Sequence, residues 1–311
     1  MADKNPSLGG IPLVFGGNVF GWTLERDASF AVLDAFYEGG GRMIDTAEGY
    51  SAWVPGNKGG DSETILGEWL ESRGVRPEML IGTKTGMEGS PGALKPENVA
   101  AALEGSLERL RTDYVDLYYA HRDDLVTTLE DVVSGYDAAY KSGKVRELGA
   151  SNYTTERLGE VIKTAERMGA QPFTVCQPCY NLVHRHEYEG ALQDLCVAKN
   201  IAALPYYGLA SGFLTGKFRS ADEWKDSSRA FSLDDAAKDG GWDTLDVLRD
   251  VACEVGVAPA QVALAWILAK PGIAAPLASA TSPEQLAELI AAVTLKLAPE
   301  HVARLDKAGK N

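Results

Sequence analysis

Four residues that can hold or exchange a proton lie at or just beyond the ends of short apolar runs in the first half of the chain. They are Asp45, Tyr50, Lys84 and His121. A free tyrosine has a pKa of about 10 and is a poor acid near neutral pH, but a nearby ammonium group lowers that pKa. We therefore predict that Lys84 lowers the pKa of Tyr50 and that Asp45 keeps Lys84 charged and oriented. His121 is suited to hydrogen-bond the carbonyl oxygen of a substrate.

These residue types suit the protonation of an oxygen while a hydride arrives at the adjacent carbon. General acid catalysis of this kind contributes roughly 10²–10⁴ in rate. Each residue also has an ordinary structural alternative: a strand-end Asp often caps a turn, a Lys is often a solvated charge, and a His is often a hydrogen-bonded core residue. Four compatible types at the ends of three successive predicted strands favour a joint catalytic site.

The elements that must position these residues follow a simple alternation of short apolar runs and longer amphipathic runs, which is typical of repeated βα units. Strands are predicted at residues 11–15, 42–45, 79–83, 114–119, 145–150, 174–177, 201–205 and 273–277. Helices are predicted at residues 29–38, 62–73, 96–110, 127–141, 154–167, 188–199, 242–255, 258–269, 283–292 and 299–308. The strand runs lack polar alternation, as expected for parallel strands that are covered on both faces.

Eight such units favour an α/β fold of the (β/α)8 TIM-barrel type, in a single domain spanning residues 1–311. The residues beyond a minimal barrel are expected in loops at 51–61 and 207–241 and in the C-terminal helix. A doubly wound sheet is the alternative, but the glycines of residues 16–21 have the wrong spacing for its dinucleotide fingerprint. In a barrel the C-terminal ends of the strands form the active site, which is where the four proton-handling residues are predicted to lie.

Bulk properties narrow the class of protein. A net charge of −14 argues against nucleic-acid or anionic-membrane partners. No run approaches the roughly 20 apolar residues of a membrane span, and the first residues lack the apolar core of a signal peptide. Four cysteines are too few to stabilise a chain of this length, so we predict a reducing, cytoplasmic location. Cys176 and Cys179 have C-x-x-C spacing, but a lone pair is weak evidence, and no metal site is predicted.

Six segments of the chain together resemble the aldo-keto reductases, and the resemblance covers nearly the whole chain. The segments are Asp-Thr-Ala-Glu-Gly-Tyr (45–50), Ile-Gly-Thr-Lys-Thr-Gly (81–86), Asp-Leu-Tyr-Tyr-Ala-His-Arg-Asp-Asp (116–124), Gly-Ala-Ser-Asn-Tyr (149–153), Leu-Ala-Ser-Gly-Phe-Leu-Thr-Gly-Lys (209–217) and Ala-Ser-Ala-Thr-Ser-Pro-Glu-Gln-Leu (278–286). The resemblance implies that Tyr50 is the general acid/base and that Asp45, Lys84 and His121 are its partners. It also implies NADPH as the cofactor, bound without a Rossmann fold, and a small carbonyl or sugar substrate.

The resemblance further assigns cofactor contacts to several groups of residues. The nicotinamide end would contact Ser151, Asn152, Gln177 and Tyr206, with Gly17 and Asn18 near it on the first loop. Asp45 and Tyr207 are also assigned to the cofactor site. The pyrophosphate would contact Leu209, Ser211, Gly212 and Lys217. The adenosine end would contact Ser279, Thr281, Gln285 and Glu288, at a helix N-terminus that favours anions.

One departure concerns the 2′-phosphate that distinguishes NADPH from NADH. Many family members place an arginine or lysine near the position of Thr281, and this chain has none there. NADH therefore stays open as an alternative cofactor. Arg219 or Arg229, in the long segment 207–241, could supply the cation, or both could be solvated loop charges.

Aromatic residues are candidates for the rim of the substrate pocket. Trp22 and Trp53 are predicted to contact substrate together with Tyr50 and His121. Tyr118, Tyr180 and Trp224 are further candidates for this rim, with core packing as the alternative and as the favoured role of Tyr118. Such a pocket would suit aldehydes and ketones of mixed polarity.

Two other functions stay compatible with the sequence. Some barrels of this type, such as the potassium-channel β subunits, act chiefly as cofactor-sensing partners of other proteins. A Schiff-base aldolase with Lys84 as the nucleophile is the third hypothesis. The neighbouring Asp45 and Tyr50 disfavour it, because a nucleophilic lysine must be neutral. The sequence leaves the oligomeric state open.

Overall fold

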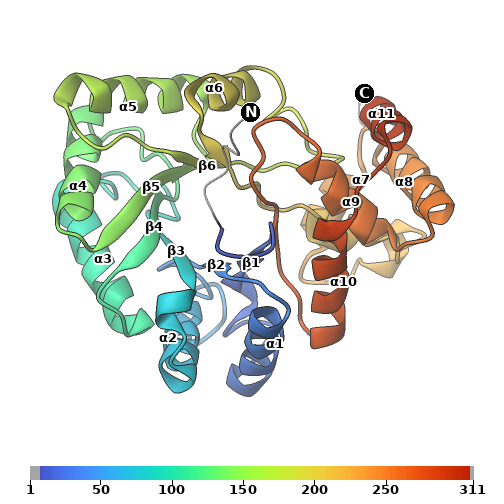
Figure 1. The fold of residues 1–311 in the computed structure, drawn as a ribbon, viewed down its shortest axis with the longest axis horizontal. Coiled ribbons are helices and arrows are strands. Elements are labelled where there is room, and N and C mark those ends of the chain that lie inside the picture. Colours follow the sequence, from blue (N-terminus) through green and yellow to red (C-terminus); the bar gives the residue numbers. More distant parts are fainter. Residues whose placement is uncertain (1–7, 309–311) are drawn as a thin grey trace.

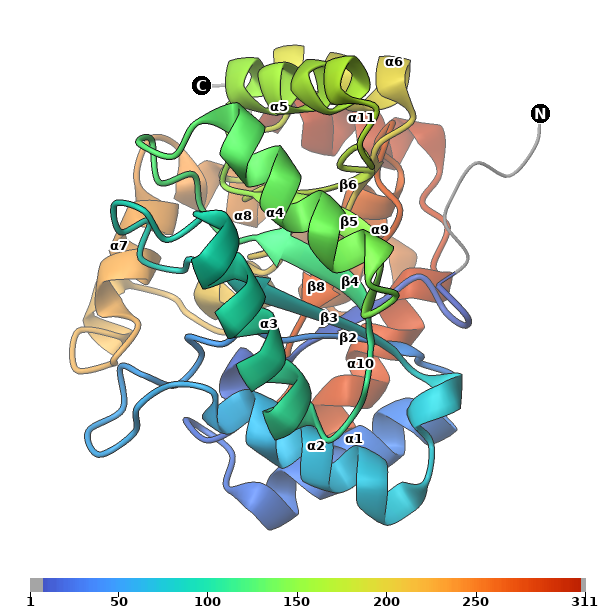
Figure 2. The same cartoon turned by 90° about the vertical axis from the view of Figure 1, so that its left-hand side faces the viewer.

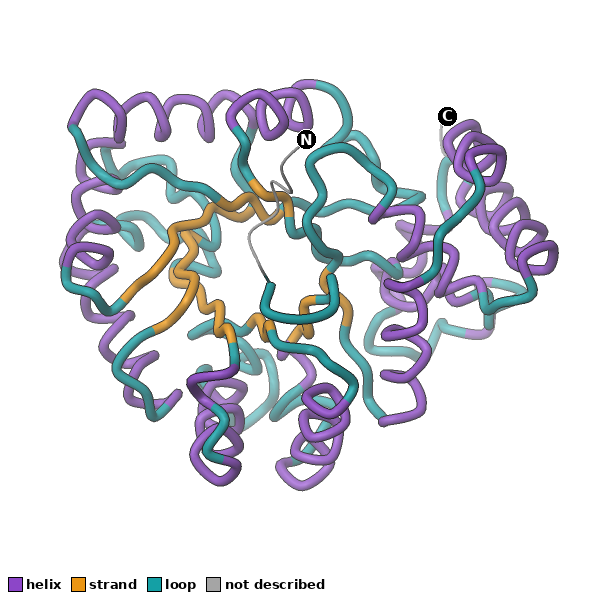
Figure 3. The backbone as a smooth tube through the Cα atoms, viewed as in Figure 1, coloured by secondary structure: helices purple, strands orange, loops and turns teal. Residues whose placement is uncertain are grey.

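A ring of parallel strands forms the centre of the molecule, as the orange segments of Figure 3 show. The structure is a computed structural model that describes residues 8–308. The strands are β1 (Val14–Gly16), β2 (Met43–Asp45), β3 (Leu80–Thr85), β4 (Val115–Ala120), β5 (Val145–Ser151), β6 (Val175–Gln177), β7 (Ala202–Ala203) and β8 (Leu277–Ala278). They form an eight-stranded sheet in the order β7-β6-β5-β4-β3-β2-β1-β8, and every paired neighbour is parallel.

The two outer strands of this order are joined by the segment that precedes β8. Ala203 donates its N–H to the carbonyl of Gly272 at 2.9 Å and accepts from the N–H of Ala274 at 2.9 Å. The N–H of Leu277 donates to the carbonyl of Pro205 at 2.8 Å. These bonds close the ring, so the predicted (β/α)8 barrel is confirmed and the doubly wound sheet is excluded.

Helices surround the barrel (Figure 1). They are α1 (Arg26–Glu38), α2 (Asp61–Arg73), α3 (Pro96–Leu110), α4 (Leu129–Lys141), α5 (Thr155–Met168), α6 (Ala191–Lys199), α7 (Ala230–Ala237), α8 (Gly241–Val255), α9 (Pro259–Leu268), α10 (Pro283–Thr294) and α11 (Pro299–Ala308). Figure 2 shows α3, α4 and α5 side by side outside the strands. Ser282 caps α10 by accepting a hydrogen bond from the N–H of Gln285, and Pro283 occupies the first helical position.

Helix α7 was not predicted, because residues 207–241 read as an irregular insertion. The helix has only eight residues and no capping side chain, so its sequence carries few of the usual signals. It is held mainly by the burial of Leu233 and Ala236. In Figure 2, α7 and the loop that follows β2 project from the same end of the barrel.

Two apolar layers fill the molecule. The barrel interior contains Val14, Met43, Leu117, Tyr119 and Leu277, and a larger core lies between the strands and the helices. Interior side chains make the barrel a packed core instead of a pore.

Three of the aromatic candidates for the pocket rim belong to this outer core. Tyr118 donates a hydrogen bond to the carbonyl of Val99 at 3.0 Å, which confirms its favoured role. Buried Tyr180 stacks on Trp266 at 5.4 Å, and buried Trp224 stacks on Trp242 at 5.6 Å. For Tyr180 and Trp224 the structure therefore shows the alternative role, core packing, and not the pocket rim.

None of the helices within residues 8–308 has by itself the length and apolar character needed to cross a bilayer. Helices α8 and α9 meet those requirements only when taken together, and they are bent by 97° relative to each other.

Candidate active site

The four proton-handling residues lie at one end of the barrel. Asp45 is the last residue of β2, Lys84 is the penultimate residue of β3, and His121 directly follows β4. Tyr50 lies in the turn after β2. Since the strands are parallel, these positions are the C-terminal ends of neighbouring strands.

The Lys84 ammonium is the centre of the cluster. Its Nζ donates to the Asp45 carboxylate, to the carbonyl of Thr46 at 2.8 Å and to the hydroxyl of Tyr50 at 3.0 Å. An ammonium has three N–H donors, so each one has an acceptor. The side chains of Lys84 and Asp45 are 0% and 1% exposed. Gln177 Nε2 donates to the second oxygen of Asp45 at 2.9 Å, so both oxygens of this buried carboxylate are bonded.

The net pKa shift of Tyr50 is opposite in direction to the predicted one. Burial raises the pKa of Tyr50, and this exceeds the lowering by the Lys84 ammonium. The prediction of a lowered pKa is therefore wrong, although Lys84 does act in the predicted direction. Burial acts to lower the pKa of Lys84, but the charges of Asp45 and Tyr50 outweigh burial and raise the pKa, which keeps Lys84 an ammonium.

His121 lies beside Tyr50 with an unused polar atom. The two rings are 5.9 Å apart at an angle of 72°. Burial, followed by the charges of Lys84 and Arg122, lowers the pKa of His121 well below its usual value, so the imidazole is neutral near pH 7. Its Nδ1 is buried and has no hydrogen-bond partner among the residues that the structure describes. A neutral imidazole of this kind is suited to hydrogen-bond a substrate oxygen.

Sequence reasoning missed Tyr119, which completes the floor of the cluster. Lys84 Nζ lies 5.6 Å from the centre of its ring, and its hydroxyl has no partner within residues 8–308. A Cβ atom added at Gly149 would come within 2.5 Å of Cδ1 of Tyr119, so glycine is required beside the ring. The Tyr118-Tyr119 pair could have indicated an inward-facing tyrosine, because successive strand residues point to opposite faces of the sheet.

The residues assigned to the nicotinamide end form one connected network next to the acid–base cluster. Asn152 Nδ2 donates to the carbonyl of His121 at 2.9 Å and to Ser151 Oγ at 3.1 Å. Ser151 Oγ donates to the carbonyl of Gln177 at 2.9 Å. The hydroxyl of Tyr206 donates to Asn152 Oδ1 at 2.8 Å. The structure therefore brings the side chains of Ser151, Asn152 and Tyr206 together with the backbone carbonyl of Gln177 at the ends of β5, β6 and β7.

Of the residues assigned to the adenosine end, Ser279 is anchored to the first loop, and Thr281 is bonded to Gln285. Ser279 Oγ lies 2.7 Å from the carbonyl of Gly16 and 2.8 Å from Asn18 Oδ1. Thr281 donates both its N–H and its hydroxyl to Gln285 Oε1 at 3.0 Å, beside the N-terminus of α10. Glu288 is exposed on α10 and forms no hydrogen bond or ion pair with another described residue.

The segment assigned to the pyrophosphate has an unusual backbone. Ala210, Ser211 and Gly212 have φ of 47°, 55° and 96° in succession. A Cβ atom at Gly212 would lie 3.7 Å from Nζ of Lys217, so glycine leaves bare backbone beside a cation. Tyr207 and Leu209 support this turn: Ser211 Oγ donates to the hydroxyl of Tyr207 at 3.1 Å, and Leu209 packs against the outer core.

An aromatic wall borders the cluster. The ring of Tyr50 lies 6.1 Å from that of Trp53, and Trp53 lies 5.6 Å from Trp22 in an edge-to-face arrangement. Trp53 is 45% exposed, so this wall is open to solvent. Of the two tryptophans predicted to contact substrate, Trp53 is therefore adjacent to the predicted acid, and Trp22 contacts Trp53.

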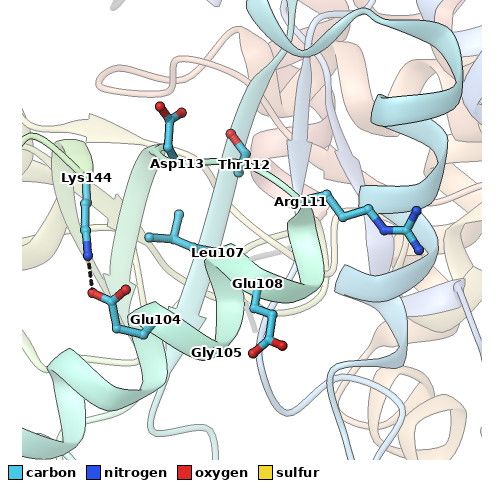
Figure 4. A pocket seen from close by; sticks show the side chains of 8 residues that line it. All are labelled: Glu104, Gly105, Leu107, Glu108, Arg111, Thr112, Asp113 and Lys144. Atoms are coloured by element: carbon cyan, nitrogen blue, oxygen red, sulfur yellow. Dashed lines mark hydrogen bonds and ion pairs between the residues drawn. The ribbon is translucent and has the colours of Figure 1, made fainter.

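A hollow of about 640 Å³ lies elsewhere on the surface (Figure 4), and it does not compete as a site. It is lined by Glu104, Gly105, Leu107, Glu108, Arg111, Thr112, Asp113 and Lys144. These residues belong to the end of α3 and to the turns before β4 and β5, at the N-terminal ends of the strands. Its cations are already engaged, since Lys144 pairs with Glu104 and Arg111 pairs with Glu68 and Glu71. Barrel enzymes use the opposite end.

Comparison with known proteins identifies relatives along nearly the entire chain. A family model described as the aldo/keto reductase family matches residues 12–310. The chain is 30% identical to a norsolorinic acid reductase of Emericella nidulans, over 95% of this chain and 77% of that protein. It is 30% identical to a probable voltage-gated potassium channel subunit beta of Oryza sativa subsp. japonica, over 92% and 89%. It is 28% identical to an NADP(+) aryl-alcohol dehydrogenase of Phanerodontia chrysosporium, over 91% and 76%.

Proposed function

Since the chain belongs to the aldo/keto reductase family, we propose that it reduces an aldehyde or ketone with NADPH, or oxidises the corresponding alcohol or sugar in the reverse direction. The class of the protein is an oxidoreductase that acts on carbonyl and alcohol groups. The observation that carries the specific proposal is the hydrogen bond of 3.0 Å between Lys84 Nζ and the hydroxyl of Tyr50, with Lys84 held by a buried carboxylate.

The polar groups around the cluster fit a nicotinamide dinucleotide. Ser151, Asn152 and Gln177 carry amide and hydroxyl groups that match a carboxamide, and Tyr206 lies beside them. The bare backbone at Gly212 beside Lys217 suits a pyrophosphate. When bound, the cofactor supplies the hydride that the carbonyl carbon accepts.

The chain's own contribution is the proton. The Tyr50 hydroxyl gives its proton to the carbonyl oxygen as the hydride arrives at carbon. The added proton and hydride convert the carbonyl group to an alcohol. The phenolate left behind lies 3.0 Å from the Lys84 ammonium, which stabilises the negative charge. Neutral His121 hydrogen-bonds the same oxygen and orients it.

The Schiff-base alternative is disfavoured by the state of Lys84. Its pKa is raised and each of its three N–H donors has an acceptor, whereas a nucleophilic lysine needs a free lone pair.

The similarity to the rice protein supports the cofactor-sensing alternative. That alternative predicts stable NADPH binding with slow turnover of every carbonyl substrate.

A single substitution tests the assigned acid. In Tyr50→Phe, the kcat for carbonyl reduction should fall roughly 10²–10⁴-fold, while the Kd for NADPH, measured by cofactor fluorescence, stays unchanged. Tyr37→Phe is the matched control, because the Tyr37 hydroxyl bonds Glu78 at 2.7 Å on an exposed part of the surface, away from the strand ends. Wild-type rates for Tyr50→Phe would show that another group donates the proton.

A further inference from the structure

Glu48 lies in the turn that holds Tyr50, and its carboxylate and its backbone both bond the neighbouring strand. Its Oε1 accepts hydrogen bonds from Thr85 Oγ1 and, at 2.8 Å, from the N–H of Gly86. The N–H of Glu48 donates to the carbonyl of Lys84 at 3.1 Å. This one residue of the turn therefore bonds three successive residues at the end of β3, the strand on which Lys84 lies.

The next residue of the turn also lies against the end of β3. A Cβ atom added at Gly49 would lie 2.9 Å from Sδ and 3.1 Å from Cβ of Met87, so the turn is in direct contact with the segment that follows the strand. Within the turn, the N–H of Tyr50 donates to the carbonyl of Ala47 at 3.2 Å. The backbone position of Tyr50 is therefore set by the way this turn is fixed to the end of β3.

Thr85 connects the same carboxylate to a third part of the site. Its hydroxyl donates to Glu48, and its carbonyl accepts from the N–H of His121 at 2.8 Å. Thr85 is only 3% exposed, so bulk water cannot readily replace the carboxylate as the partner of its hydroxyl. Glu48 therefore links the turn after β2 both to the end of β3 and, through Thr85, to the residue that follows β4.

The contribution of Glu48 is one of geometry. The charges that shift the pKa of Tyr50 are those of Lys84 and Asp45. The hydrogen bonds that the Glu48 side chain accepts from Thr85 and from the next residue both end on one oxygen, Oε1. A glutamine amide offers the same acceptor oxygen without the charge, so replacement by glutamine separates position from charge.

We propose that Glu48 is a positioning residue, which keeps the hydroxyl of Tyr50 at the Lys84 ammonium by fixing the turn to the end of β3. The proposal rests on the function proposed above and extends it to a residue that acts through Tyr50. Misplacement of a reacting group by about 1 Å can cost on the order of 10²-fold in rate. Loss of the Glu48 carboxylate should therefore slow the chemical step, while the network of Ser151 and Asn152 at the nicotinamide end stays intact.

The test measures the single-turnover rate of 4-nitrobenzaldehyde reduction by the enzyme with NADPH bound, and the Kd for NADPH by cofactor fluorescence. Glu48→Ala should lower the rate about 10- to 100-fold and leave the Kd unchanged. Glu48→Gln should recover most of that loss, because its Oε1 accepts the same two hydrogen bonds.

Thr85→Val examines the same contact from the other side and remains informative if Glu48→Ala does not fold. It replaces one hydroxyl by a methyl group and should lower the single-turnover rate roughly 2- to 10-fold, as expected for one lost hydrogen bond. Since both changes act on one contact, Glu48→Ala combined with Thr85→Val should be no slower than Glu48→Ala alone.

Glu147→Ala is the matched control. Glu147 also accepts a hydrogen bond from a threonine hydroxyl of the neighbouring strand region, that of Thr174 at 2.6 Å, but this pair lies near the N-terminal ends of β5 and β6, opposite to the site. Glu147→Ala should keep the wild-type rate. A thermal scan of Glu48→Ala and Glu147→Ala checks that each is folded at the assay temperature.

Several results would overturn the proposal. They are a wild-type rate in Glu48→Ala, a loss in Glu48→Gln as large as in Glu48→Ala, and a loss of rate that is matched by weaker NADPH binding, which would indicate a general structural role. Tyr50→Phe, measured alongside, separates these results from a failure of the proposed function. An inactive Tyr50→Phe beside a fully active Glu48→Ala would refute only the positioning role, whereas a wild-type rate in Tyr50→Phe would refute the assigned acid and the positioning role with it.

Discussion

Replacement of Lys84 by Met tests whether the buried pair at the strand ends is as costly to disrupt as the structure implies. The change removes the ammonium and leaves the Asp45 carboxylate, which is 1% exposed, with Gln177 as its remaining donor. Removing one partner of a buried pair costs about 3–5 kcal/mol, because the other charge is stranded away from water. With an unfolding entropy of about 2.1 cal/mol/K per residue over 311 residues, each kcal/mol shifts the Tm by about 1.5 °C, so the Tm should fall by roughly 5–8 °C.

Urea unfolding and a thermal scan measure the loss of stability in Lys84→Met, and two further variants serve for comparison. Lys144→Met removes a cation whose ion pair with Glu104 is 39% and 59% exposed, so it should cost only about 0–1 kcal/mol. Asp45→Asn combined with Lys84→Met removes the stranded charge and should recover most of the lost stability. If Lys84→Met were no worse than Lys144→Met, or the double variant no better than the single one, the account of a stranded buried charge would be wrong.

Two further predictions concern pH and packing. Burial keeps the pKa of Tyr50 above its ordinary value and the pKa of His121 well below its own, so neither group changes its protonation between about pH 6 and 8, and the reduction rate should be flat there in a saturating NADPH assay. An inflection near the usual pKa of histidine would contradict this. Gly149→Ala should destabilise the fold by about 1–3 kcal/mol in urea unfolding, because the new methyl group meets the ring of Tyr119 at 2.5 Å. Gly159→Ala, on α5 with its nearest neighbour at 3.9 Å, should instead stabilise it by about 0.5–1 kcal/mol, and changes of the same sign in both variants would refute the packing argument.

The sequence predicted the fold well because buried parallel strands and amphipathic helices have different periodicities. Helix α3 has the predicted bounds, 96–110, and it begins at Pro96, whose fixed φ suits a first helical turn. The last two strands were predicted as five-residue runs but are two residues long, since the barrel closes through single hydrogen bonds from Ala203, Ala274 and Leu277 instead of a regular ladder. Apolar composition shows that a segment is buried, but it does not show how many of its residues pair.

The sequence likewise predicted which residues form the site, but it did not predict how burial changes their pKa values. Residue types and strand-end positions were enough to bring Asp45, Tyr50 and Lys84 together, and these three side chains are hydrogen-bonded in a line. The net pKa of Tyr50 was mispredicted, because charge pairing can be inferred from composition whereas desolvation depends on how tightly the neighbouring elements exclude water. The Tyr50 phenol is therefore protonated near neutral pH, and the nearby ammonium stabilises the phenolate as it forms.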